Sequence, residues 1–174
     1  MILWLNGAFG AGKSSVAEAL RMRINPSFLY DPEQVGYFLW DNFPEELKRK
    51  GDFQHMAIWR EMNYKILKHL DGNYAGTVIV PMALYVRRYY DEIIGALISG
   101  GVDVRHFILT APKEVILERL AERGEPADGW AAAHIDRCLR AFETEIPGVK
   151  IDTGDKSADE AVEAILNLSG QSPE

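Results

Sequence analysis

Short apolar runs alternate with longer segments of helical periodicity along the whole chain. The apolar runs predict strands at Ile2–Asn6, Ser27–Tyr30, Thr77–Val80, Val104–Thr110 and Val149–Asp152. The other periodic segments predict helices at Gly12–Arg23, Glu33–Asn42, Phe53–Leu70, Val86–Ser99, Lys113–Glu122, Trp130–Thr144 and Ala158–Leu168. Such alternation is typical of an α/β fold whose parallel sheet is covered by helices on both faces. We therefore predict one three-layer α/β domain over residues 1–174, with a five-stranded parallel sheet.

The stretch after the first strand, Gly7–Ser14, matches the phosphate-binding pattern G-x-x-x-x-G-K-[ST] in the required strand, loop and helix context. Glycines at positions 7 and 12 allow backbone amides to turn inward around a phosphate. Lys13 can reach the β- and γ-phosphates, and the Ser14 hydroxyl is placed to bind Mg²⁺. The predicted nucleotide-binding residues of this loop are Gly7, Ala8, Phe9, Gly10, Ala11, Gly12, Lys13, Ser14 and Ser15. The pattern indicates a P-loop, kinase-like fold, with ATP and Mg²⁺ as the expected ligands.

Open parallel sheets bind ligands at the carboxyl ends of their strands. Asp31 and Glu33 follow the second strand, which we expect to lie beside the first and so to face the loop. The Asp31 carboxylate could take a proton from a substrate hydroxyl or help to hold Mg²⁺. Alternatively, it only caps the helix that Pro32 begins. The third strand ends in Pro81-Met82, so it supplies no second carboxylate for the metal.

Two arginines one helical turn apart, Arg119 and Arg123, precede a Gly- and Pro-containing connection. A lid over about residues 123–137 could close their guanidinium groups over a transferring phosphoryl group, and Arg137 could join them. The alternative is a solvated helix face. Both arginines are therefore predicted to bind the nucleotide and assist catalysis.

The substrate pocket is harder to predict because its walls come from distant parts of the chain. We expect Asp31, Glu33, Tyr37, Arg60 and Tyr85 to contact the substrate. Arg60 could equally extend its charged end to solvent. Trp40, beside Tyr37, could line an apolar part of the same pocket, or pack in the core.

Composition narrows the class of protein. The formal net charge of −7 argues against a nucleic-acid-binding protein, which usually carries a basic surface. The single cysteine, Cys138, excludes an internal disulfide and fits a reducing cytoplasm, with packing its favoured role. No apolar run approaches the length of a membrane span and no charged leader precedes the first strand, so we expect a cytoplasmic protein.

Several motifs together resemble the tunicamycin resistance proteins. They are Trp4–Ser14, Tyr30–Glu33, Trp59-Arg60, Val80–Met82 and Ile135–Cys138. More distantly, the layout is similar to that of chloramphenicol phosphotransferase and shikimate-kinase-like enzymes. The resemblance implies an ATP-binding α/β fold, antibiotic resistance as the setting, and phosphoryl transfer to the drug. It also implies that Asp31 is the catalytic base, because an Asp at the matching place serves so in the phosphotransferases.

Three functions remain to be compared. An ATP-dependent small-molecule kinase would use Lys13, Ser14 and Asp31 together to phosphorylate a hydroxyl, for example that of a nucleoside antibiotic. A nucleotide-dependent protein that sequesters the drug would need no catalytic base. A GTPase switch is disfavoured because the chain contains neither D-x-x-G nor N-K-x-D. The sequence leaves the acceptor and the oligomeric state open.

Overall fold

The computed structural model describes residues 1–48, 52–126 and 128–171. The strands are β1 (Ile2–Gly7), β2 (Ser27–Leu29), β3 (Thr77–Pro81), β4 (Val104–Thr110) and β5 (Val149–Asp152). The helices are α1 (Lys13–Arg23), α2 (Glu33–Asn42), α3 (Ala57–Asn73), α4 (Arg87–Tyr90), α5 (Ala96–Ser99), α6 (Lys113–Glu122), α7 (Trp130–Thr144) and α8 (Ala158–Ser169). All five predicted strands are confirmed, with ends that differ by at most one residue.

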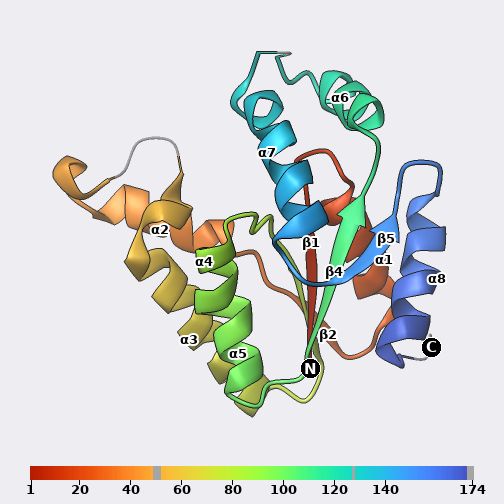
Figure 1. The fold of residues 1–174 in the computed structure, drawn as a ribbon. Helices are drawn as coiled ribbons and strands as arrows, with labels where there is room; N and C mark the ends of the chain where they lie inside the picture. Colours follow the sequence, from red (N-terminus) through yellow and green to blue (C-terminus); the bar gives the residue numbers. More distant parts are fainter. Residues whose placement is uncertain (49–51, 127, 172–174) are drawn as a thin grey trace.

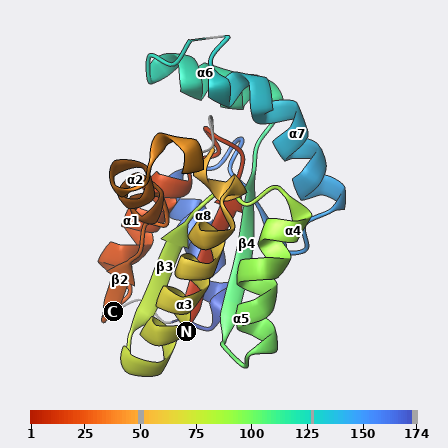
Figure 2. The ribbon, with the colours of Figure 1, turned by 90° about the vertical axis from the view of Figure 1, so that its left-hand side faces the viewer.

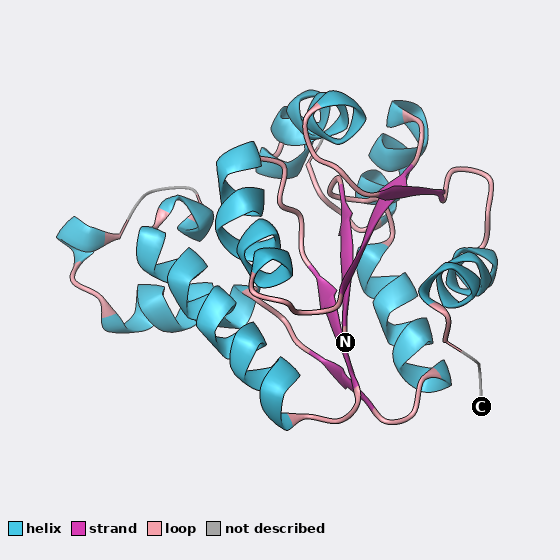
Figure 3. Ribbon diagram, turned by 60° about the horizontal axis from the view of Figure 1, so that its bottom comes forward, coloured by secondary structure: helices cyan, strands magenta, loops and turns pink. Residues whose placement is uncertain are grey.

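The sheet is parallel, with the strand order β2-β3-β1-β4-β5. The predicted adjacency of the first and second strands is therefore wrong, because β3 lies between them. The reason is burial: Val78, Ile79 and Val80 are almost completely enclosed, as a central strand requires, whereas the three-residue β2 is partly exposed, as suits an edge. The predicted three-layer α/β architecture is confirmed (Figure 3).

Alternate residues of the central strand serve opposite faces of the sheet, since side chains along a strand point alternately to either side. Leu3 and Leu5 pack with α1 and α8, whereas Ile2 and Trp4 pack with residues of α3, α5 and α7. Figure 1 shows α1 and α8 on one side of the strands and α3, α4 and α5 on the other. The two apolar cores hold the strand ends, and hence the loops that follow them, in fixed positions.

Two predicted helices differ in detail. The segment Phe53–Leu70 is divided into a 3-10 turn, Phe53–His55, and α3, which begins at Ala57 and runs to Asn73. The predicted helix Val86–Ser99 consists of α4 and α5 joined by a π-helical turn at Asp91–Gly95. No helix in the described part of the chain is long and apolar enough to cross a membrane.

The helices α6 and α7 rise above the carboxyl ends of the strands (Figure 1; Figure 2). The lid that we predicted over 123–137 covers their connection and the start of α7, and residue 127 lies outside the described residues. The loops that follow β1, β2 and β3 lie below this pair of helices. The fold therefore brings the phosphate loop and the turn that contains Asp31 and Glu33 to one end of the sheet.

Candidate functional site

The loop after β1 has the backbone that the glycine pattern predicts. Gly7, Gly10 and Gly12 have φ angles of 143°, 86° and 92°, a region that other residues rarely adopt. A Cβ atom at Gly7 would also lie 2.6 Å from the backbone oxygen of Leu109 on the neighbouring strand. At Gly12, by contrast, a Cβ would meet no atom within 4 Å, so only the backbone conformation requires glycine there. The loop thus combines close packing against β4 with an open side at the start of α1.

The Lys13 side chain curls back over this loop. Its Nζ donates hydrogen bonds of 2.9 Å to the carbonyl oxygens of both Gly7 and Ala8. It also lies 5.6 Å from the centre of the Phe9 ring. Burial lowers the pKa of Lys13 to about 8. An ammonium held in this way, with incomplete solvation, is suited to bind phosphate oxygens.

Buried polar side chains hold the loop in place from both sides. The Asn6 Oδ1 accepts hydrogen bonds from the backbone amides of Gly7 (3.0 Å) and Leu84 (2.8 Å). On the other side, the Thr153 hydroxyl after β5 donates to the Ala11 carbonyl at 3.0 Å. The ends of three strands are thereby joined to the loop, so its backbone is ordered by the sheet rather than by the loop sequence alone.

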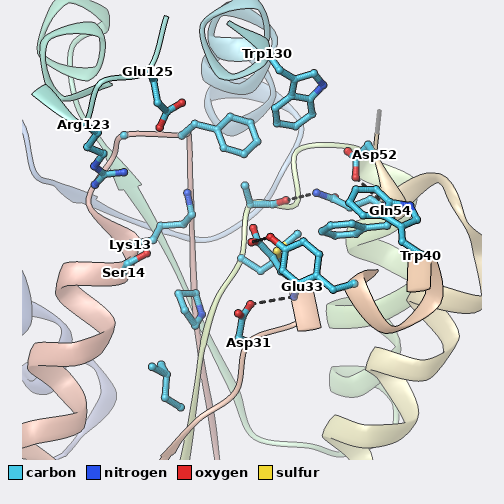
Figure 4. Close-up of a pocket in the computed structure, with 18 residues that line it drawn as sticks. Lys13, Ser14, Asp31, Glu33, Trp40, Asp52, Gln54, Arg123, Glu125 and Trp130 are labelled. Atoms are coloured by element: carbon cyan, nitrogen blue, oxygen red, sulfur yellow. Dashed lines mark hydrogen bonds between the residues drawn. The ribbon is translucent and has the colours of Figure 1, made fainter. Parts of the chain in front are cut away.

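A cleft of about 590 Å³ opens from the loop. A volume of this size is typical of small-molecule sites. Its described lining includes Phe9, Gly10, Lys13, Ser14, Asp31, Glu33, Tyr37, Trp40, Asp52, Phe53, Gln54, Arg123, Glu125 and Trp130. Figure 4 shows Lys13, Ser14 and Arg123 at one end and Trp40, Asp52 and Gln54 at the other, with Asp31 and Glu33 between them. Despite the unexpected strand order, Asp31 and Glu33 therefore face the same cleft as the phosphate loop.

The turn after β2 positions the two carboxylates. Asp31 accepts hydrogen bonds from the Glu33 backbone amide and from the Gln34 side chain, both of 3.0 Å. The buried Trp59 donates from Nε1 to the Pro32 carbonyl at 3.0 Å. Asp31 therefore orders the start of α2, as the capping alternative predicts, and also lines the cleft. Burial, with the nearby Asp31 charge, raises the pKa of Glu33.

The far wall of the cleft contains residues that the sequence analysis missed. Asp52, Phe53 and Gln54 belong to the turn before α3, and the predicted helix began at Phe53, one residue after Asp52. The Phe53 ring packs against Trp40 with centroids 5.1 Å apart, and a Cβ on Gly36 would clash with that ring. The signal available in the sequence was weak: an Asp two residues before Gln54 can cap a turn, but nothing near it indicates a cleft.

A second pocket, of about 450 Å³, lies on the other side of the loop, with a lining that includes Ala11, Gly12, Ser15, Val16, Arg119, Arg123, Thr153, Lys156 and Ser157. Arg119 donates to the Thr153 carbonyl at 2.6 Å, which fixes its guanidinium at this pocket instead of over the main cleft. Arg123 lines both pockets, and no hydrogen bond or ion pair joins its side chain to another residue within the described ranges. Of the two arginines predicted to act on the phosphoryl group, Arg123 belongs to the described lining of the main cleft and Arg119 does not.

Two predicted substrate residues are not brought to the cleft. Arg60 is 3% exposed, forms an ion pair with Glu92, and stacks over Tyr89 at 4.4 Å. Its guanidinium is enclosed because three partners satisfy it within the core, so we withdraw its predicted substrate role. Tyr85 is also buried, behind Phe9, and burial raises its pKa to about 12. Tyr85 therefore supports the cleft wall instead of lining it.

The exposed Arg137 lies over the Tyr85 ring at 5.4 Å and is likewise absent from the described cleft lining. Its predicted share in the transfer is therefore not supported. Tyr37 does line the cleft, and its hydroxyl donates to Glu33 at 3.2 Å.

The residues present fit a magnesium ion that is bound mainly by phosphate oxygens. Ser14 and Asp31 offer a hydroxyl and a carboxylate in the same cleft. Mg²⁺ usually takes only one or two protein oxygens together with phosphates and water. The described residues include no group of three or more His, Cys, Asp or Glu side chains that could hold a metal by themselves.

Comparisons with known proteins agree with this geometry. Residues 3–146 match the sequence profile of a family described as AAA domain. The chain is 30% identical to the tunicamycin resistance protein of Deinococcus radiodurans, whose structure superimposes with a TM-score of 0.84 over 99% of this chain and 96% of that one. A gluconokinase from Sinorhizobium meliloti (18% identity, TM-score 0.65, 97% and 90% covered) and a shikimate kinase from Aquifex aeolicus (22%, 0.56, 98% and 97%) share the fold. No curated protein sequence matched the chain.

Proposed function

This chain belongs to the AAA-domain family and to the tunicamycin resistance proteins, and on that premise we propose that it is an ATP-dependent phosphotransferase. The acceptor that we propose is a hydroxyl group of a tunicamycin-type drug, and the outcome is resistance. We expect the protein to act in the cytoplasm, where both ATP and Mg²⁺ are present. The observation that carries the proposal is the shared cleft: Lys13 and Ser14 open onto the same space as Asp31 and Glu33.

The nucleotide would occupy the loop and the second pocket. Loop amides and Lys13 bind the β- and γ-phosphates, since the amides at the start of α1 and the ammonium favour anions. The adenine base would lie beside Arg119 and Thr153, whose mutual hydrogen bond fixes the Arg119 guanidinium at that pocket. Ser14 and Asp31, which line the same cleft, would hold Mg²⁺, and the ion would neutralise charge on the phosphates.

The transfer of the phosphoryl group needs a general base and a cation. Asp31 accepts the proton of the acceptor hydroxyl while that oxygen bonds to the γ-phosphorus and the bond from this phosphorus to ADP breaks. Arg123 neutralises negative charge that develops on the transferring group. Its position at the meeting point of the two pockets, with no partner among the described residues, supports this role.

Mass spectrometry of tunicamycin after incubation with the protein, ATP and Mg²⁺ tests the proposal. We expect one added phosphoryl group per drug molecule and an equal amount of ADP. Asp31→Asn should abolish the product, whereas Asp41→Asn, the same change at an exposed position of α2 outside the cleft, should not. If the wild-type protein leaves the mass of the drug unchanged, phosphoryl transfer is refuted.

Drug sequestration without transfer is the second candidate. The observation that favours it is the end of β3, where Pro81 and Met82 line the cleft and this strand end supplies no carboxylate. Many P-loop enzymes place a metal-binding carboxylate there. Sequestration predicts protection in proportion to the amount of protein, and drug binding that leaves both ATP and drug unchanged.

A further inference from the structure

Charge divides the cleft into two halves. Lys13 and Arg123, the described cations of its lining, lie at the end next to the phosphate loop (Figure 4). Asp31, Glu33 and Asp52 supply carboxylates to the floor and the far wall, and Glu125 is the one described carboxylate that lies beside the cations instead. An anionic acceptor placed in this far half would face carboxylates, and like charges at short range repel.

Arg60, the further cation that we expected in the cleft, does not line it. Arg60 comes from the adjacent helix α3, but its guanidinium bonds to Glu92 and donates to the Gln54 carbonyl at 2.5 Å. Its side chain is 4% exposed and belongs to the lining of a different pocket, together with His55 and Tyr89, and not to the described lining of this cleft. The described far half thus has no counter-ion for a carboxylate or phosphate group of an acceptor.

Aromatic rings form the remaining walls of this half. Tyr37 and Trp130, from α2 and α7, are 44% and 42% exposed although both line the cleft. Trp40 and Phe53 continue the wall below them, and the Trp130 ring packs edge-on against Phe9 at 4.8 Å. Exposed rings that surround a cavity are suited to a flat unsaturated ring of a ligand, which they can contact face to face or edge to face.

Asp52 lines the same cleft as these rings, and its own turn holds its side chain in place. It is 7% exposed, and its Oδ1 accepts the Gln54 backbone amide at 2.8 Å. Gln54 is itself fixed, because its Nε2 donates to the Ala83 carbonyl at 3.1 Å. The second carboxylate oxygen of Asp52 makes no hydrogen bond to another residue of the described ranges. This oxygen keeps some accessible surface, because no side-chain oxygen of the described residues is both fully buried and without a hydrogen bond, so a donor group on a ligand can reach it.

We propose that the acceptor of this enzyme is an uncharged, hydroxylated molecule that carries a flat unsaturated ring, and that Asp52 determines this specificity by accepting a hydrogen bond from an N–H or O–H group of that molecule. The proposal rests on the proposed function, because it assigns the acceptor half of the same cleft. It separates this chain from enzymes of the same fold that act on sugar acids. Asp52 binds the acceptor and takes no part in moving the phosphoryl group.

Calorimetric titration without nucleotide tests the proposal independently of catalysis. The ligands are tunicamycin, which is uncharged, and shikimate and gluconate, which are carboxylates. The proteins are the wild type, Asp52→Asn and Asp41→Asn. The Asn at position 52 keeps an oxygen for the Gln54 amide, so the turn is retained, but it removes the charge. Asp41→Asn makes the same change of net charge on the exposed face of α2.

We expect the wild type and Asp41→Asn to bind tunicamycin equally and to bind neither acid at the same concentrations. Asp52→Asn should bind tunicamycin about tenfold more weakly, as expected for a lost hydrogen bond to a charged group. Its thermal stabilisation by ATP should equal that of the wild type, because Asp52 lies away from the phosphate loop.

Equal tunicamycin binding by Asp52→Asn and Asp41→Asn would overturn the proposal, as would tighter binding of either acid than of tunicamycin by the wild type, or no binding of tunicamycin at all. The expected binding pattern together with an absence of phosphorylated drug would support the acceptor assignment and refute only the transfer reaction.

Discussion

Raising the pH above 8 should weaken ATP binding through a single side chain. Burial lowers the pKa of Lys13 from its ordinary 10.5 to about 8 in the free protein. Phosphate oxygens beside the ammonium would favour its charged form and raise that pKa again, so the protonated protein binds ATP more tightly. Below pH 8 the free protein already carries the proton and the affinity is constant. Above pH 8 the proton must be taken up on binding, and the affinity falls.

The size of the effect follows from the fraction of protein that carries the proton. At pH 9 about one tenth of Lys13 is protonated in the free protein, so the apparent dissociation constant should be roughly tenfold larger than at pH 7. At pH 8 about half a proton should be taken up for each ATP bound. The heat of binding should therefore differ between buffers with different ionisation enthalpies.

Titrations of ATP from pH 7 to 9.5 in two such buffers would measure both quantities. Lys13→Arg serves as the control, because a guanidinium remains charged throughout this range. We expect its affinity to be lower but independent of pH, without proton uptake. A wild-type affinity that stays constant to pH 9.5, or a slope that Lys13→Arg shares, would refute the assignment of a lowered pKa to Lys13.

Three further predictions concern the loop, the base and the core. Gly12→Ala, at a φ of 92°, should lower the free energy of unfolding by about 1–2 kcal/mol in urea titrations and should weaken ATP binding. By contrast, Gly72→Ala, at a helical position with open space around it, should raise the free energy of unfolding by about 0.5–1 kcal/mol. Asp31→Asn should lower the rate of ADP release with drug by a factor of about 10² to 10⁴ with little change in ATP affinity; an unchanged rate would exclude Asp31 as the base. Arg60→Met should cost about 3 kcal/mol of stability, because it breaks the buried pair with Glu92, but it should leave the KM for the acceptor unchanged; a KM effect without destabilisation would restore the substrate role that we withdrew.

Local sequence patterns were sufficient to predict the strands and the phosphate loop. The apolar runs at the strands and the spacing of Gly7, Gly12, Lys13 and Ser14 depend on interactions within a few residues, so they can be recognised without the rest of the chain. The structure confirms the five strands and gives the loop glycines the positive φ angles that their role requires. Asp31 was also found correctly as a cleft residue, although the strand order used in that argument was wrong.

What only the tertiary structure decided was which side chains share a space. Arg60 and Asp52 are eight positions apart, yet one is enclosed by Glu92, 32 residues further on, and the other lines the cleft. The lowered pKa of Lys13 likewise depends on its burial, and the charges that act on it belong to residues far away in the sequence, such as Arg123. Hydrogen bonding along a strand or helix is local and leaves a periodic signal in the sequence, whereas burial and charge at the cleft arise from the packing of distant segments and leave none.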